Sequence, residues 1–193
     1  MKDRGALLRV DLTTEKITSE SLPDEVCHKY LGGEGINDWL LWEHFLKVDP
    51  KIDPLSPDNV MVAGVGPLAG TGCGGGSKMK WTFKSPAYHM FGDSASGGYF
   101  PGALRWAGFD HIVITGRASR PVYLWIDNQK AELRDAGRLW GKTAHEADDL
   151  IHAELGDADI ETAAISNAAE NGVTWASLVV SRHRGAGRTG AGT

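Results

Sequence analysis

The chain has 193 residues, a length that suits one compact domain with a buried core, and we expect residues 1–193 to form a single domain. The net charge of −5 argues against nucleic acid or an anionic membrane surface as a main partner. No apolar run approaches the roughly 18 residues of a membrane span, and the N-terminus lacks the apolar core of a secretory signal, so we expect a cytoplasmic protein.

The first fifty residues predict a hairpin followed by two helices. Two short β-leaning segments, 7–12 and 16–20, are separated by three turn residues. Pro23 and the two acids behind it fit the first turn of a helix that runs to residue 31 and stops at two glycines. From Glu34 onward, apolar residues recur at helical spacing and predict a second helix with one face in the core.

The middle of the chain predicts buried strands and one short helix. A proline-rich loop at 49–59 leads into the apolar run 59–65, which suits a buried strand. Residues 78–84 alternate with period two, so Met79, Trp81 and Phe83 share one face of a strand and Lys78, Lys80 and Thr82 the other. A helix over 99–107 follows, with a proline in its first turn and a glycine at its end.

The last part predicts further strands around one helix. Segments 111–115, 122–126 and 130–134 follow one another closely and favour a β-meander. Thr143 and Glu146 form a capping-box pattern that opens a helix ending at Gly156. Two final strands are expected at 160–165 and 173–180, and the whole reads as an α+β domain rich in strands with short peripheral helices.

Glycine is the one compositional excess, with 25 residues concentrated in three turns. Two of these turns flank the strand at 78–84, the second being residues 92–98, and the third is 182–193. Glycines free backbone amides to bind anions, and phosphates above all. Basic residues accompany each turn, so the three turns could line one concave site for a polyanionic ligand or be unrelated; these residues are Lys78, Arg105, Arg182, Arg184 and Arg188.

Competing motifs are weaker. The spacing of a dinucleotide loop occurs at 70–75 and at 185–190, but no predicted helix follows either match. Residues 141–143 match the end of a phosphate-binding loop, but the glycine that should begin the loop, Gly137, is one residue too close. Asp93 and Glu170 are possible acids beside glycine turns, without a base–nucleophile pair. Two cysteines are too few to ligate an iron–sulfur cluster, which needs about four thiolates.

Segments along the whole chain resemble the N-terminal domain of the aldehyde:ferredoxin oxidoreductase family of tungsten enzymes. The segments that carry the resemblance lie in order from end to end, and they are LRVDLTT (8–14), YLGG (30–33), DPLSPDN (53–59), GPLAGTG (66–72), KSP (84–86), DSASGG (93–98), VYLWI (122–126), ELRDA (132–136) and RHRGAGR (182–188).

The resemblance implies a domain of two β-sheets that forms a base for a bis-pterin cofactor. That cofactor is tungsten, or molybdenum, held by two molybdopterins, with a magnesium ion that bridges their phosphates. Lys78 stands where the family usually has an arginine, and Ala95 where it often has an asparagine. Lysine keeps the charge but loses the planar fork of arginine. Thr189 replaces a usual glycine, which restricts the last turn.

Residue by residue, the resemblance implies two sets of ligands and no identified catalytic residue. Backbone carbonyls of Ala95 and Gly185 would hold magnesium. The residues implied to contact the pterin cofactor are Lys78, Ala95, Ser96, Gly97, Gly98, Arg182, Arg184, Gly185, Ala186, Gly187 and Arg188.

The resemblance also implies what other polypeptide must supply. A [4Fe–4S] cluster would be ligated by residues outside this chain, in later helical domains or in a partner subunit. Ferredoxin or an iron–sulfur subunit would accept the electrons, and an oligomer is expected. Aldehyde oxidation to carboxylate is the first hypothesis; the alternatives are reduction of an aromatic acyl-CoA thioester in the same family, and a non-catalytic scaffold or assembly subunit that keeps the fold.

Overall fold

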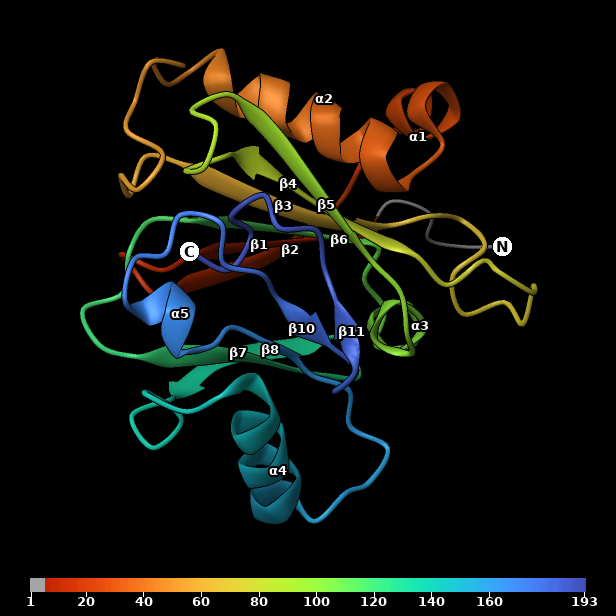
Figure 1. The fold of residues 1–193 in the computed structure, drawn as a ribbon. Helices are drawn as coiled ribbons and strands as arrows, with labels where there is room; N and C mark the ends of the chain where they lie inside the picture. Colours follow the sequence, from red (N-terminus) through yellow and green to blue (C-terminus); the bar gives the residue numbers. More distant parts are fainter. Residues whose placement is uncertain (1–5) are drawn as a thin grey trace.

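A computed structural model describes residues 6–193. Its centre is a six-stranded sheet in the order β2-β1-β6-β3-β4-β5 (Figure 1). Strands β1 and β6 are parallel and every other neighbouring pair in this sheet is antiparallel. The strand bounds are β1 (Ala6–Asp11), β2 (Lys16–Ser21), β3 (Val60–Val65), β4 (Met79–Lys84), β5 (Phe91–Ser96) and β6 (His111–Thr115).

Two helices, α1 (Asp24–Tyr30) and α2 (Gly33–Phe45), cover one face of this sheet (Figure 1). Helix α2 packs on β3 and β4, where Ile36, Leu40 and Leu41 bury their side chains against Val60 and Val62. Burial of one such side chain contributes roughly 1.5–3 kcal/mol, so these contacts fix the helical layer. The predicted hairpin, both helices and the buried strand β3 are confirmed.

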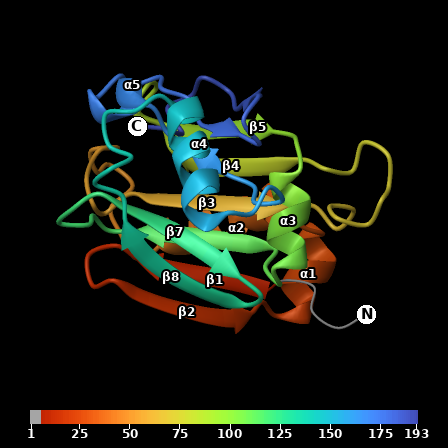
Figure 2. The same ribbon diagram turned by 90° about the horizontal axis from the view of Figure 1, so that it is seen from below.

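The other face carries a second layer of β-structure (Figure 2). A hairpin of β7 (Val122–Asp127) and β8 (Lys130–Asp135) forms one small sheet. A second small sheet contains β9 (Ala163–Ala164), β10 (Val179–Val180) and β11 (Arg184–Gly185). The expected strand-rich α+β fold is thus confirmed; its other helices are α3 (Phe100–Trp106), α4 (Ala144–Leu155) and α5 (Asn167–Glu170).

The core between these two β layers contains the face of β4 that the alternating pattern predicts. Met79, Trp81 and Phe83 are all at most 5% exposed, and they belong to one cluster with Leu178 and Val180. Because successive side chains of a strand point to opposite faces, Lys80 and Thr82 lie on the helical side instead. The strand β4 therefore separates an apolar layer from a polar one.

The capping box that the sequence predicts for α4 is present. Thr143 Oγ1 accepts a hydrogen bond from the backbone N–H of Glu146 at 3.3 Å, and the Glu146 carboxylate accepts from Thr143 N–H at 2.8 Å. Gly156 ends the helix in the left-handed region, at φ +66°. These groups satisfy donors and acceptors that would otherwise be unpaired at the two helix ends.

The predicted β-meander is correct for the hairpin of β7 and β8 and wrong for β6. Strand β6 lies in the middle of the large sheet between β1 and β3, whereas β7 and β8 pair only with each other in the other layer. The reason is long-range pairing: β6 satisfies its backbone groups on both sides with strands that precede it by roughly fifty and a hundred residues. Closeness in sequence therefore does not predict which strands pair with β6.

Two other differences concern the glycine-rich end of the chain. Residues 92–96, expected as a turn, belong to the edge strand β5, which Trp81 Nε1 helps to hold by donating to Ser96 Oγ at 3.0 Å. The two long strands expected at 160–165 and 173–180 are reduced to the two-residue strands β9 and β10. Helix α5, with Ser166 as its N-cap, lies between them. Within residues 6–193, no helix has the length and apolar character needed to cross a bilayer.

Candidate functional site

The first and second glycine-rich loops leave the same end of neighbouring strands. The first loop, residues 66–78, precedes β4, and the second, residues 97–99, follows β5. Met79 and Ser96 are register partners, so the loops meet directly beyond that pair. Ser77 Oγ donates a hydrogen bond to the carbonyl of Gly98 at 2.6 Å. A side chain-to-backbone bond of this kind fixes one loop on the other.

The third glycine-rich loop, residues 181–193, joins the second at the start of α3. Ser181 Oγ accepts hydrogen bonds from the N–H groups of Tyr99 and Phe100 at 2.9 and 3.0 Å. It thereby caps a helix that has no side-chain cap of its own. Gly98 has φ +106°, and a Cβ built there would lie 2.5 Å from Ser181 Oγ. Only glycine permits this approach of the two loops.

Farther along, the third loop follows strand β5. The buried Ser94 donates from its Oγ to the carbonyl of Gly187 at 2.8 Å, and Thr189 Oγ1 donates to the Asp93 carbonyl at 2.9 Å. Ser85 Oγ also donates to the Thr189 carbonyl at 2.6 Å. Thr189 therefore supplies a hydrogen bond to the edge strand.

The three glycine-rich loops carry three exposed cations. The side chains of Lys78, Arg184 and Arg188 belong to exposed residues, and within residues 6–193 none of them forms an ion pair. A Cβ on Gly185 would meet no atom within 4 Å, so the backbone there is open to a ligand. Unpaired positive charge beside open backbone suits a phosphate-bearing ligand. None of these three side chains lines the pocket around His111 or the pocket around Pro57 and Arg117.

Two other predicted basic residues are already paired. Arg105 forms an ion pair with Asp110, whose side chain is 7% exposed. Arg182 contacts two acids of α4, Asp148 at 3.1 Å and Asp149. Of the five predicted cations, two therefore hold elements together, and the other three form no ion pair among residues 6–193.

The other predicted residues occupy the three loops and their flanking strands. Ala95 and Ser96 lie on β5, Gly97 and Gly98 in the second loop, and Ala186 in the third, where its N–H donates to the Leu178 carbonyl at 2.8 Å. The part of Ala95 and Gly185 in holding magnesium stays a prediction. No group of three or more His, Cys, Asp or Glu side chains suited to a metal ion occurs among residues 6–193.

The two acids predicted beside the glycine turns are engaged elsewhere. Asp93 points to the helical face, where Lys80 pairs with it and, at 3.0 Å, with Glu34. Burial alone would lower the pKa of Lys80, but the hydrogen bonds and negative charges of Asp93 and Glu34 together have the larger effect, so the pKa is raised. The pKa of the nearby Asp38 is also raised, mainly by burial and secondly by the negative charges of Glu34 and Asp93. The Glu170 carboxylate accepts from Gly141 N–H at 2.8 Å.

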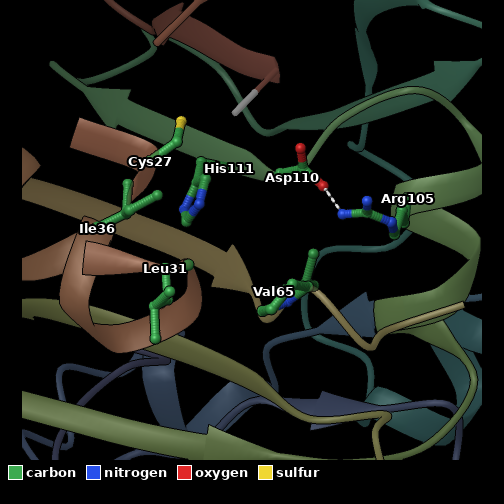
Figure 3. Close-up of a pocket in the computed structure, with 9 residues that line it drawn as sticks. Cys27, Leu31, Ile36, Val65, Arg105, Asp110 and His111 are labelled. Carbon is green, nitrogen blue, oxygen red and sulfur yellow. Dashed lines mark hydrogen bonds and ion pairs between the residues drawn. The ribbon is translucent and has the colours of Figure 1, made fainter. Parts of the chain in front are cut away.

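A small pocket lies between α1, α2 and β6 (Figure 3). His111 lines it and is 1% exposed; burial lowers its pKa to about 3, so the ring is neutral. The Asn37 amide donates to the Val62 and Lys80 carbonyls, so its Oδ1 faces His111 Nδ1 at 3.0 Å and Nδ1 carries the proton. The cavity measures about 10 Å³, room for one water at most, and the His111 network is structural.

Sequence reasoning missed the serines that connect the loops. Ser77, Ser94 and Ser181 each bond across more than twenty residues of sequence, and a serine beside glycine is otherwise an ordinary loop residue. No local pattern announces such a bond, because its partner is set by the tertiary fold. The adjacency of Gly76 and Ser77 just before β4 is the one local signal, and it concerns Ser77 alone.

Comparison with known proteins gives a consistent result. Residues 7–193 match the family model described as aldehyde ferredoxin oxidoreductase, N-terminal domain. A tungsten-containing aldehyde ferredoxin oxidoreductase of Pyrococcus abyssi is 39% identical over 188 residues, which are 97% of this chain and 30% of that protein. The WOR-like subunit of an aliphatic sulfonate oxidoreductase of Pyrococcus furiosus is 39% identical over 71% of this chain and 22% of its own length.

A solved structure also matches. It is the active site complex BamBC of benzoyl coenzyme A reductase in complex with 1,5-dienoyl-CoA, with a TM-score of 0.92 and 37% identity. The match covers 97% of this chain and 28% of that one. The chain thus spans about a third of the length of these relatives.

Proposed function

The chain belongs to the aldehyde ferredoxin oxidoreductase family, whose N-terminal domain it matches over residues 7–193, and we propose that it forms one wall of a tungsten bis-molybdopterin site. The observation that carries this proposal is the contact among three glycine-rich loops that carry Lys78, Arg184 and Arg188, exposed cations that form no ion pair among residues 6–193. A tungsten cofactor agrees with the names of the relatives.

The residues present fit a large polyanion. Phosphate groups accept charge-assisted hydrogen bonds from guanidinium and ammonium groups, and these bonds are about twice as strong as neutral ones. Open backbone at Gly72, Gly74, Gly75 and Gly185 lets a ligand approach without steric hindrance from a Cβ. Ala95 and Gly185 would offer backbone carbonyls to a magnesium ion between the phosphates, as hard oxygen ligands suit that cation.

The division of labour follows from what the chain contains. The bound metal cofactor would supply two-electron redox chemistry, while the chain binds and orients the cofactor and sets its electrostatic surroundings. Lys78 adds positive charge at the point where β4 begins, and Arg184 and Arg188 add it from the third loop. Ser77 and Ser181 keep these charges together by holding the loops in contact.

Electron transfer out of the site needs other polypeptide. Cys27 is buried and Cys73 is exposed, and two thiols are too few for a [4Fe–4S] cluster. A cluster would therefore take its ligands from helical domains or a partner subunit, and this chain spans about 30% of the length of its relatives. Ferredoxin or an iron–sulfur subunit would take the electrons, in a cytoplasmic and oligomeric enzyme.

Aldehyde oxidation to carboxylate is the activity we propose first, because the tungsten relatives at 38–39% identity carry that name. Reduction of an aromatic acyl-CoA is the second candidate, and the 37% identity to the benzoyl coenzyme A reductase complex favours it. Purified protein with its partners, assayed with an aldehyde and a one-electron acceptor dye and separately with benzoyl-CoA and a strong reductant, distinguishes the two.

The cofactor site is tested by substitution in the natively purified assembly. Lys78→Ala and Arg184→Ala are each expected to lower tungsten or molybdenum per chain several-fold, because each removes a charge-assisted contact. Lys47→Ala is the matched control: this exposed lysine follows α2, away from the loops. Equal metal content in all four proteins would refute the proposed site, and a metal-free wild type would support the scaffold alternative.

A further inference from the structure

Arg182 belongs to the third loop but makes its contacts with α4. Its Nη1 lies 3.1 Å from Asp148 Oδ2 and also contacts Asp149 Oδ1. The two acids differ in their surroundings: the Asp148 side chain is 4% exposed and that of Asp149 58%. A buried carboxylate requires a charged or hydrogen-bonding partner, whereas an exposed one is solvated by water.

Asp148 is connected to the loop by a second route. Thr162 Oγ1 donates to Asp148 Oδ1, and the Thr162 carbonyl accepts from the N–H of Ser181 at 2.9 Å. One buried carboxylate therefore holds both Ser181, through Thr162, and Arg182, directly. Its neighbour His152 lies with Nδ1 3.6 Å from Asp148 Oδ2 and adds a further contact on the helix itself.

The two residues held in this way have an unusual backbone. Ser181 and Arg182 adopt φ +48° and +60°, a left-handed conformation that non-glycine residues keep only when their surroundings impose it. The bend turns the chain so that Ser181 Oγ caps α3, and a Cβ on Gly98 would lie 3.2 Å from Arg184 Cγ. Arg184 thus lies beside the second loop directly after this bend.

We propose that Asp148 is a positioning residue: through Arg182 and Thr162 it holds residues 181–185 in the bend that brings Arg184 to the second glycine-rich loop. The inference rests on the proposed cofactor site and deepens it. Arg182, which the family resemblance implies as a cofactor contact, acts through the loop conformation, and Arg184 and Arg188 supply the positive charge to the ligand.

The test compares two acid-to-amide changes that alter charge equally. Asp148→Asn weakens the buried contact with Arg182, while the control Asp149→Asn changes the exposed acid that touches the same guanidinium. Amide hydrogen exchange of the full chain is measured at 181–185 and in β3 and β6. Asp148→Asn is expected to speed exchange at 181–185 by about tenfold or more without changing β3 or β6, and to lower tungsten per chain several-fold in the native assembly. Asp149→Asn is expected to match wild type.

A second pair of variants covers the case in which Asp148→Asn does not fold. Arg182→Gln should give the same local loss of protection, and Arg182→Lys should recover part of it, because lysine keeps the charge beside Asp148. Unchanged exchange at 181–185 in folded Asp148→Asn or Arg182→Gln would overturn the inference. A wild type without tungsten or molybdenum would refute the proposed cofactor site instead, and the exchange result would still decide the positioning role.

Discussion

Gly98→Ala tests the contact between the second and third glycine-rich loops. At φ +106° a residue with a Cβ is strained, which costs roughly 1–2 kcal/mol. The new Cβ would lie 2.5 Å from Ser181 Oγ, so that hydroxyl must move and lose two hydrogen bonds, each worth about 0.5–1.5 kcal/mol. The free energy of unfolding should fall by roughly 2–5 kcal/mol.

Gly72→Ala is the control that isolates strain from steric contact. Gly72 also has positive φ, +79°, but a Cβ there meets no atom within 4 Å. Its cost is then the backbone strain alone, roughly 1–2 kcal/mol. Urea unfolding of the two variants and the wild-type chain, with linear extrapolation, measures both changes. Equal destabilisation by the two substitutions would show that Ser181 does not fasten the loops.

Three further results are expected. Gly64→Ala should unfold the chain or destabilise it by about 3 kcal/mol or more, since a Cβ there would lie 2.1 Å from Asn37 Oδ1 inside the buried network; a near-normal melting temperature would contradict that packing. The free energy of unfolding should rise with pH between about 3 and 6.5, by at most about 1.4 kcal/mol per unit, because unfolded His111 takes up a proton that the folded state, with the pKa lowered by burial, excludes. Acid titration of wild type and His111→Gln checks this, and an identical slope in both would refute it. Thr143→Ala should cost about 1 kcal/mol through loss of the α4 cap, measured by thermal unfolding against Thr174→Ala, which changes an exposed loop threonine, and no loss would mean that the cap is dispensable.

Local signals in the sequence predicted most elements and the pairing within local hairpins, but not the pairing of strands far apart in the chain. The capping box at Thr143 and the alternation through Trp81 are local patterns, and both predictions are confirmed. Strand β5 was missed because Gly92, Ser94 and Ser96 have little strand preference of their own. Its stability comes from β4 and from side-chain bonds such as Trp81 to Ser96.

The candidate site was also predictable in its residue types but not in its tertiary contacts. Glycines and cations in three turns predicted loops suited to an anion, and the structure brings those loops together. Which cations stay free was not predictable, because the partners of Arg105 and Arg182 are set by folding: Asp110 precedes β6, and Asp148 lies on α4. Residue type gives the charge, whereas tertiary contacts decide where that charge is used.

The most direct test of the central claim is the metal content of the wild-type protein, purified natively with whatever polypeptides accompany it. Elemental mass spectrometry of that assembly, together with a pterin assay, should find a stoichiometric amount of tungsten or molybdenum and two pterins for each metal. Absence of both metals and of pterin, with the partner polypeptides present, would contradict the claim that the loops around Lys78 and Arg184 bind this cofactor.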